Sequence, residues 1–203
     1  MASAAILTGG RATRFGGRDK SALVVEGRRI IDRQLEELSR VTDDILIVGR
    51  EIALPPGAAV PGAQTVRQIV DRMIQCGPLG GLDAAFAAAR DAVVVALAGD
   101  MPFVTAPLLA HLLSLADLAD AVVPRTKRGY HPLCAVYTRV CQPVVERRLA
   151  RRQLALTGLF DEIRIHVVEV GEIEAFGDPD RLLANVNTAD EHGEIESLRR
   201  HKV

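Results

Sequence analysis

Short apolar runs alternate along the chain with longer segments in which apolar positions recur every three or four residues. The runs predict buried strands, because strands covered on both faces read as continuous apolar stretches. They fall at residues 4–7, 45–48, 92–98, 121–123, 133–137 and 165–170. The helical spacing predicts helices at residues 28–40, 80–90, 105–117, 143–152, 154–162 and 189–201. This alternation predicts a three-layer α/β/α fold with a mostly parallel central sheet.

Length and composition narrow the class of protein. The 203 residues suit one domain over residues 1–203, and a hydrophobic content of 48% supplies a full core. A net charge of −1 predicts no nucleic-acid or membrane partner. No run of apolar residues is long enough to span a membrane, no secretory signal is visible, and the three cysteines lack metal-like spacing. We therefore expect a cytoplasmic protein with reduced cysteines. The segment at 51–62, which holds three prolines and two glycines, is expected to be a loop.

The stretch after the first predicted strand carries the strongest chemical signal. Residues 7–20 read LTGGRATRFGGRDK, with four glycines, three arginines and one lysine. Glycines let backbone N–H groups approach a ligand, and cationic side chains suit a polyphosphate. Such a loop at the carboxyl end of the first strand is where an open α/β sheet binds its ligand. The stretch predicts a nucleoside triphosphate site; the simpler alternative is a surface loop rich in Gly and Arg.

Neither common phosphate loop fits this stretch. A Walker loop needs Gly directly before Lys-Ser, but Asp19 precedes Lys20, and adjacent Gly9 and Gly10 break the dinucleotide fingerprint. The remaining pattern, L-x-G-G-x-x-x-R-x-G-G-x-D-K, closely resembles the signature loop of the molybdenum cofactor guanylyltransferases, the MobA family of nucleotidyltransferases. Thr8 and Phe15 stand where that family usually has Ala and Met. The resemblance implies a Rossmann-like sheet of the nucleotide-diphospho-sugar transferase type. It also implies a nucleotide-binding set of Leu7, Thr8, Gly9, Gly10, Arg14 and Lys20.

A second segment places a carboxylate at the end of a strand. Residues 93–102 read VVVALAGDMP, so Asp100 is expected at the same sheet edge as the glycine loop. A single carboxylate beside a triphosphate suits Mg²⁺, which takes few protein ligands; alternatively Asp100 only caps a turn before Pro102. The segment resembles the C-D-M-P or C-D-T-P element of the family, whose Asp binds the magnesium of the nucleotide. Gly99 stands here in place of the Cys.

A third segment, GPLGGL at residues 77–82, resembles the family's G-P-L-x-G loop over the nucleotide. The resemblance implies nucleotide contacts from Gly77 and Gly80. It also matches the upstream Asp71, whose carboxylate suits either the donor edge of guanine or the ribose hydroxyls. The alternative is a helix start that touches no ligand.

Two weaker matches point to an acceptor site. NVNTAD at residues 185–190 resembles the family's N-[VI]-N-T-P-E element, with Ala189 in place of Pro, and implies that Asn185 and Asn187 line the cleft. The alternative is a cap for the last helix. His131-Pro132 resembles the family's H-P before a strand, although a lone His is more often structural.

The resemblance implies transfer of GMP from GTP to the terminal phosphate of molybdopterin, giving molybdopterin guanine dinucleotide and pyrophosphate. Arg14 and Lys20 would neutralise the β- and γ-phosphates, and Mg²⁺ would sit on Asp100, so these three form the expected catalytic set. Implied partners are molybdenum-insertion proteins and apo-molybdoenzymes or their chaperones. One alternative is a CTP-dependent cytidylyltransferase of molybdopterin or of a phosphorylated small molecule, which Gly9 argues against. The other is a non-catalytic molybdopterin- or nucleotide-binding protein.

Overall fold

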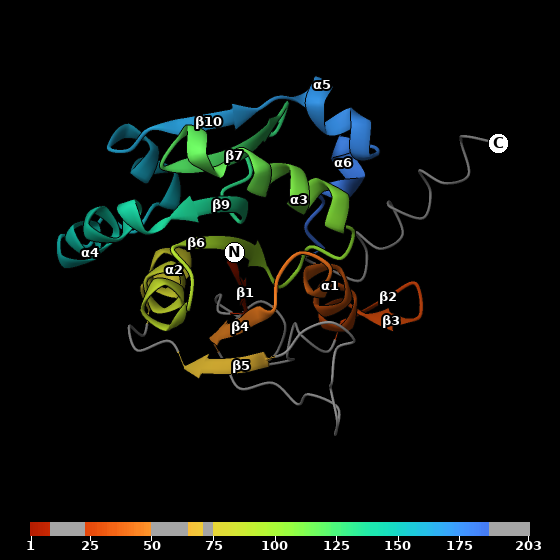
Figure 1. Cartoon of the computed structure of the whole chain (residues 1–203), viewed down its shortest axis with the longest axis horizontal. Coiled ribbons are helices and arrows are strands. Elements are labelled where there is room, and N and C mark those ends of the chain that lie inside the picture. Colours follow the sequence, from red (N-terminus) through yellow and green to blue (C-terminus); the bar gives the residue numbers. More distant parts are fainter. Residues whose placement is uncertain (9–22, 50–64, 71–74, 187–203) are drawn as a thin grey trace.

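A computed structural model describes residues 1–8, 23–49, 65–70 and 75–186, and shows a sheet with helices on both faces (Figure 1). The strands of the sheet lie in the order β10-β7-β9-β6-β1-β4-β5. Their bounds are β1 (Ser3–Leu7), β4 (Asp44–Gly49), β5 (Thr65–Val70), β6 (Val93–Ala98), β7 (Ala121–Thr126), β9 (Cys134–Thr138) and β10 (Ile165–Val168). Strand β8 (Gly129–Tyr130) pairs with β7, and β2 (Val24–Val25) and β3 (Arg28–Arg29) form a separate hairpin.

The sheet is mostly parallel, as predicted. Only β9 runs against its neighbours β6 and β7, whereas the other neighbours along this order pair in parallel. The reversal follows from the short connection between β7 and β9, because a parallel crossover needs a dozen residues or more. Strands β1, β4, β6 and β7 therefore end at one edge of the sheet, which we call the carboxyl edge.

Helices cover both faces of the sheet and complete three layers (Figure 1). One face carries α1 (Ile30–Ser39), α3 (Ala106–Ser114), α5 (Val170–Ile173) and α6 (Pro179–Leu182). The other carries α2 (Gly77–Ala88) and α4 (Gln142–Ala150). Short 3₁₀ helices lie between these elements, namely η3 (Ala116–Leu118), η4 (Arg139–Cys141), η5 (Leu156–Asp161) and η6 (Glu174–Phe176).

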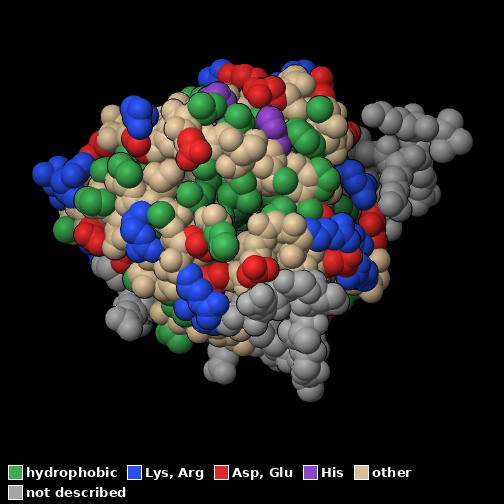
Figure 2. Space-filling view, in the orientation of Figure 1, with side chains coloured by type: hydrophobic (Ala, Val, Ile, Leu, Met, Phe, Trp, Pro, Cys, Tyr) green, Lys and Arg blue, Asp and Glu red, His purple; other side chains and the backbone are tan. Residues whose placement is uncertain are grey.

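The surface matches the balanced charge of the sequence. Figure 2 shows acidic and basic side chains interspersed on the visible face, with hydrophobic side chains gathered toward its middle. No helix in the described parts of the chain is long and apolar enough to cross a bilayer.

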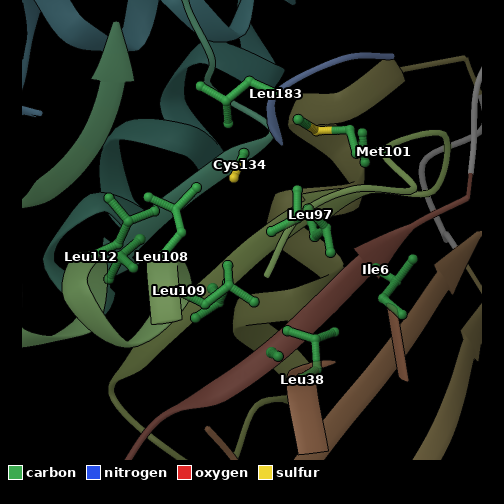
Figure 3. Close-up of a cluster of buried hydrophobic side chains, with 14 of the residues drawn as sticks. Ile6, Leu38, Leu97, Met101, Leu108, Leu109, Leu112, Cys134 and Leu183 are labelled. Atoms are coloured by element: carbon green, nitrogen blue, oxygen red, sulfur yellow. The ribbon is translucent and has the colours of Figure 1, made fainter. Parts of the chain in front are cut away.

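Strand β1 is the centre of the core. All five of its residues are at most 7% exposed, and its side chains alternate between the two layers of helices. Ala4 and Ile6 join the cluster against α1 and α3, whereas Ala5 and Leu7 join the cluster against α2 and α4. Figure 3 shows Ile6 in the first cluster, together with Leu97 of β6 and Leu38 of α1. Burial on both faces explains the uninterrupted apolar run in the sequence.

Three of the predicted elements differ from the observed ones for local reasons. The helix expected from residue 28 begins at Ile30, because the two arginines before it pair with β2 in the hairpin. The strand expected to reach residue 170 ends at Val168, because Glu169 forms a capping box with Glu172 and starts α5. The helix expected at 154–162 is the 3₁₀ helix η5, which contains the helix-weakening Gly158.

The loop expected at 51–62 and the helix expected at 189–201 lie outside the described residues. The hairpin β2–β3 and the strand β5 were not expected. Strand β5 carries polar Arg67 and Gln68 in its middle because it is an edge strand, which removes the continuous apolar signal.

A buried carboxylate ties the amino edge of the sheet together. The Asp44 side chain at the start of β4 is 4% exposed, and its Oδ1 accepts a hydrogen bond from Arg67 Nη2 at 2.7 Å. Its Oδ2 accepts from Ser3 Oγ at 2.7 Å and from the Arg90 backbone N–H at 3.1 Å. Burial opposes the charge of Asp44, but these donors outweigh it and hold the pKa of the carboxyl below its ordinary value.

We predict that Asp44→Ala lowers the free energy of unfolding by about 3–5 kcal/mol, because it leaves Arg67 without its buried partner. The pKa of Asp44 is lower in the folded state than in the unfolded state. The ionised carboxylate therefore stabilises the fold at pH values above the unfolded-state pKa, and this stabilisation is lost as the pH falls through the folded-state pKa. Denaturant unfolding at neutral and acidic pH should therefore show the deficit of the variant shrinking in acid. The exposed neighbour Asp43 provides the control Asp43→Ala, and equal losses in the two variants would contradict the account.

Candidate functional site at the carboxyl edge

Three backbone hydrogen bonds join the chemistry-bearing segments at the carboxyl edge. The N–H of Gly99 donates to the carbonyl oxygen of Leu7 at 3.0 Å, which fixes the turn after β6 against the end of β1. The N–H of Val186 donates to the carbonyl oxygen of Asp100 at 2.8 Å, and the N–H of Ala98 donates to that of Leu133 at 2.8 Å. Four separate sequence segments therefore meet around the turn that carries Asp100.

Leu7 and Thr8 hold the exit from β1. Leu7 is 7% exposed and lies opposite Val48 of β4 and Ala98 of β6. Thr8 donates twice to the carbonyl oxygen of Val48, from its N–H at 2.8 Å and from its hydroxyl at 3.0 Å. The hydroxyl is an anchor that the Ala usual at this position in the resembling family would lack. Gly9, Gly10, Arg14 and Lys20 follow in the part of the chain that the structure does not describe.

Asp100 stands half-buried in a tight turn directly after β6. The turn is closed by a hydrogen bond from the N–H of Met101 to the carbonyl oxygen of Ala98 at 3.3 Å, and Met101 is 1% exposed. The position confirms that this carboxylate lies at the same edge as the end of β1. A Cβ at Gly99 would lie 3.4 Å from the carbonyl oxygen of Leu7, an ordinary contact, so space does not require Gly in place of the Cys.

The segment GPLGGL is the start of helix α2 and not a loop. Helix α2 begins at Gly77, which has a positive φ, as does Gln75 two residues before it. No side-chain hydrogen bond caps the N-terminus of the helix. Gly77 is exposed, whereas Gly80 is buried. A Cβ at Gly81 would lie 3.3 Å from Leu7 Cδ2, so this glycine lets the helix approach the end of β1. The N-terminus of α2 thus lies near the carboxyl edge, where the positive end of the helix dipole favours an anion or an acceptor oxygen. Asp71 lies outside the described residues.

A small apolar cluster secures the segment that contains Asn185. Ala184 and Val186 pack with Val25, Ile30 and Phe103, and Asn185 between them is exposed. The alternation leaves the Asn185 side chain pointing away from this cluster. Asn187, its predicted companion, is not among the described residues.

An ion pair strengthens the same junction. Arg181 of α6 stacks its guanidinium 4.1 Å from the centroid of the Phe103 ring and donates to Glu26 Oε1 at 2.9 Å. Glu26 and Gly27 form the tight turn of the β2–β3 hairpin, with φ of 50° and 76°. This contact could not be predicted from the sequence, because no local pattern joins residues so far apart.

His131 lies in the hairpin before β9, next to the segment that pairs with the end of β6. Its Nε2 is hydrogen bonded to Thr126 Oγ1 at 2.8 Å. Burial lowers the pKa of His131 below its ordinary value, the nearby Arg128 lowers it further, and Asp180 acts in the opposite direction. The ring is therefore neutral at neutral pH, and it offers one hydrogen-bond donor and one acceptor without carrying charge.

The described residues provide no enclosed metal cage. No three His, Cys, Asp or Glu side chains cluster among them. A lone carboxylate does fit a hard divalent cation whose other ligands are phosphate oxygens and water. Asp100, in the turn after β6 beside the end of β1, provides such a carboxylate. The residues present therefore fit a cation that arrives with a nucleotide.

Several known proteins are similar to this chain over most of its length. The family described as "MobA-like NTP transferase domain" matches residues 4–163. A probable molybdenum cofactor guanylyltransferase of Methanosarcina acetivorans is 35% identical, covering 97% of this chain and 89% of the relative. The molybdenum cofactor guanylyltransferase of Desulfosudis oleivorans is 31% identical, covering 95% of this chain and 93% of the relative.

Solved structures share the fold. Molybdopterin-guanine dinucleotide biosynthesis protein A of Archaeoglobus fulgidus has a TM-score of 0.77 at 24% identity, covering 99% of this chain and all of that one. The 2-C-methyl-D-erythritol 4-phosphate cytidylyltransferase of Thermus thermophilus has a TM-score of 0.65 at 16% identity, covering 98% of this chain. The family match and the relatives of 31–35% identity place the chain in the class of nucleotidyltransferases. Within that class, the chain belongs to the MobA-like NTP transferase family.

We predict that replacing each of the two charged neighbours of His131 shifts the pKa of its ring, in opposite directions. Arg128→Gln removes a cation that disfavours the imidazolium, so the pKa of His131 should rise toward its ordinary value. Asp180→Asn removes an anion that favours the imidazolium, so the pKa should fall further. An NMR titration of the His131 ring measures both shifts. Arg151→Gln at the end of α4 should leave the titration unchanged, and shifts of the same sign in the two test variants would contradict the assignment.

Proposed function

We propose that this protein transfers GMP from GTP to the terminal phosphate of molybdopterin, releasing pyrophosphate and forming molybdopterin guanine dinucleotide. One observation carries the proposal: the Leu7–Gly99 hydrogen bond of 3.0 Å sets the Asp100 turn beside the point where β1 enters the glycine and arginine loop. The matched family and the names of the relatives with 31–35% identity support the same activity. These names also favour GTP over CTP, although the cytidylyltransferase of Thermus thermophilus shares the fold.

The proposed nucleotide site is built from Leu7 and Thr8, the loop glycines Gly9 and Gly10, and the cations Arg14 and Lys20. Backbone N–H groups of the loop would face the phosphates, and Arg14 and Lys20 would neutralise the negative charge that grows on the leaving pyrophosphate. Asp71, Gly77 and Gly80 would hold the base and ribose. Of these last two, the exposed Gly77 is the one at the open start of α2.

Asp100 is proposed as the ligand of Mg²⁺. When bound, this ion supplies positive charge to the phosphate oxygens during transfer. The role of Asp100 is to hold its carboxylate at a fixed place beside the end of β1, which the turn from Ala98 to Met101 provides. No general base is required in this chain, because the terminal phosphate of the acceptor is already an anionic nucleophile. Catalysis is then mainly positioning and electrostatics.

The proposed acceptor site is built from Asn185, Asn187 and His131. Asn185 is exposed next to Val186, whose N–H is bound to the Asp100 carbonyl oxygen, and Asn187 would extend the same edge. His131 would contribute a neutral hydrogen-bonding ring from the hairpin before β9. In the cell, molybdenum-insertion proteins and apo-molybdoenzymes or their chaperones are the proposed partners, and the cytoplasm is the proposed location.

The proposal is tested by incubating the purified chain with Mg²⁺, molybdopterin and each nucleoside triphosphate in turn, and identifying the dinucleotide product by mass spectrometry. Molybdopterin guanine dinucleotide from GTP is expected. Product from CTP alone would favour the cytidylyltransferase alternative, and binding without any product would favour the non-catalytic alternative.

We predict that Asp100→Asn lowers kcat by about two orders of magnitude or more, because it removes the anchoring charge while keeping the side-chain shape. GTP binding should change much less, since the loop supplies most phosphate contacts. Steady-state kinetics and calorimetry measure the two effects. The matched control is Asp117→Asn, which alters an exposed carboxylate of η3. Near-wild-type kcat in Asp100→Asn would remove this residue from the mechanism.

We predict that Gly9→Ala shifts nucleotide preference from GTP toward CTP, mainly by weakening GTP. The added methyl group would crowd a purine, at a cost of about 1–3 kcal/mol, or about tenfold to a hundredfold in kcat/KM. The measurement is kcat/KM for both nucleotides in wild type and variant. An unchanged ratio, or a wild-type preference for CTP, would show that this glycine does not select the base.

A further inference from the structure

Gln34 is a buried polar side chain on the apolar face of helix α1. It is 2% exposed, and its neighbours on the buried face are Ile30, Ile31, Leu35 and Leu38. Burying a side-chain amide in such surroundings is unfavourable unless its polar atoms find partners. The amide nitrogen of Gln34 finds two partners, and both lie in the turn that carries Asp100.

The two hydrogen bonds bracket Asp100. Gln34 Nε2 donates to the carbonyl oxygen of Ala98 at 2.7 Å and to the carbonyl oxygen of Met101 at 3.0 Å. These carbonyls precede and follow the pair Gly99-Asp100, so one amide group joins both ends of the turn to α1. The turn also donates from Gly99 to Leu7 and accepts from Val186, and Met101 packs in the apolar cluster shown in Figure 3.

Filling of the core does not by itself account for the Gln34 side chain. Its Oε1 is buried and has no hydrogen-bond donor among the residues that the structure describes. An unsatisfied buried acceptor offsets part of what the two donated bonds contribute. An apolar side chain of similar size would fill the same space without this penalty, but it would leave the carbonyl oxygens of Ala98 and Met101 without this donor, so the amide is explained by the turn that it binds and not by filling of the core.

We propose that Gln34 is a positioning residue for the Asp100 carboxylate, and this proposal rests on the function proposed above. By fixing both ends of the turn to α1, Gln34 sets where the carboxylate stands relative to the end of β1 and to the metal-bound nucleotide. Displacement of a reacting group by an ångström is enough to cost about 100-fold in rate. Gln34 itself touches neither substrate nor metal in this scheme.

The test compares wild type with Gln34→Met, which keeps the volume and removes both donors. We expect kcat to fall about tenfold to a hundredfold, the Mg²⁺ concentration for half-maximal GTP binding in calorimetry to rise several-fold, and the KM for GTP to change little. The Val186 N–H, bound to the Asp100 carbonyl oxygen, should exchange with deuterium faster. Gln142→Met, which removes an amide donor at the start of α4, is the control and should change none of these.

A core-filling role for Gln34 would leave the Val186 exchange rate and the Mg²⁺ requirement of Gln34→Met at wild-type values, and this result would overturn the proposal. Deuterium exchange is measured without nucleotide. It therefore tests whether Gln34 holds the turn independently of whether the protein uses GTP. If Gln34→Met does not fold, NMR of the wild-type protein still tests the proposal. The Gln34 side-chain amide resonances should be protected from exchange and should shift when Mg²⁺ and GTP are added, and unshifted, unprotected resonances would overturn the proposal.

Discussion

The parallel pairing of β1 with β6 is the constraint on which the rest of the site depends. In this register Leu7 lies opposite Ala98, and the next hydrogen bond along joins Leu7 to Gly99. Because both strands are buried on both faces, a slip of one residue would reverse every side chain of β1 between the two clusters. The core therefore fixes the distance between the end of β1 and the turn that carries Asp100.

Two further sets of contacts hold this junction from one face of the sheet. Gln34 of α1 joins the ends of the Asp100 turn, and the cluster around Phe103 holds the segment with Asn185 against the β2–β3 hairpin. On the opposite face, the close approach of α2 at Gly81 brings an uncapped helix start to the same edge. The site is thus assembled by contacts from both layers of helices, while the proposed chemistry needs only positive charge and fixed positions.

The parts of this account that were predictable from sequence are those with a local signature. The buried runs of β1 and β6 and the carboxylate at position 100 follow from strand periodicity and from the shared edge of a parallel sheet. Helix α2 was predicted three residues too late, because its glycine start carries no helix propensity. The reversal of β9 was not predicted, since an antiparallel strand in a buried position has the same apolar run as a parallel one.

Long-range polar contacts left no signal in the sequence. Gln34 is one polar residue within an amphipathic helix, and its partners lie 64 and 67 residues further along the chain. Glu26 and Arg181 are 155 residues apart, so their pairing depends on the completed fold. Thr8 stands where the resembling family usually has Ala, and only the position of the Val48 carbonyl oxygen shows what its hydroxyl binds.

The central claim is that a metal-bound nucleotide sits at the carboxyl edge beside Asp100. Paramagnetic broadening by Mn²⁺ in the presence of GTP tests it directly, because the broadening of each amide signal falls steeply with distance from the ion. The account predicts strong broadening at Gly99, Asp100 and Val186, and little at Asp44 on the amino edge. Broadening that spares the Asp100 turn, or that is centred on another edge of the sheet, would contradict it.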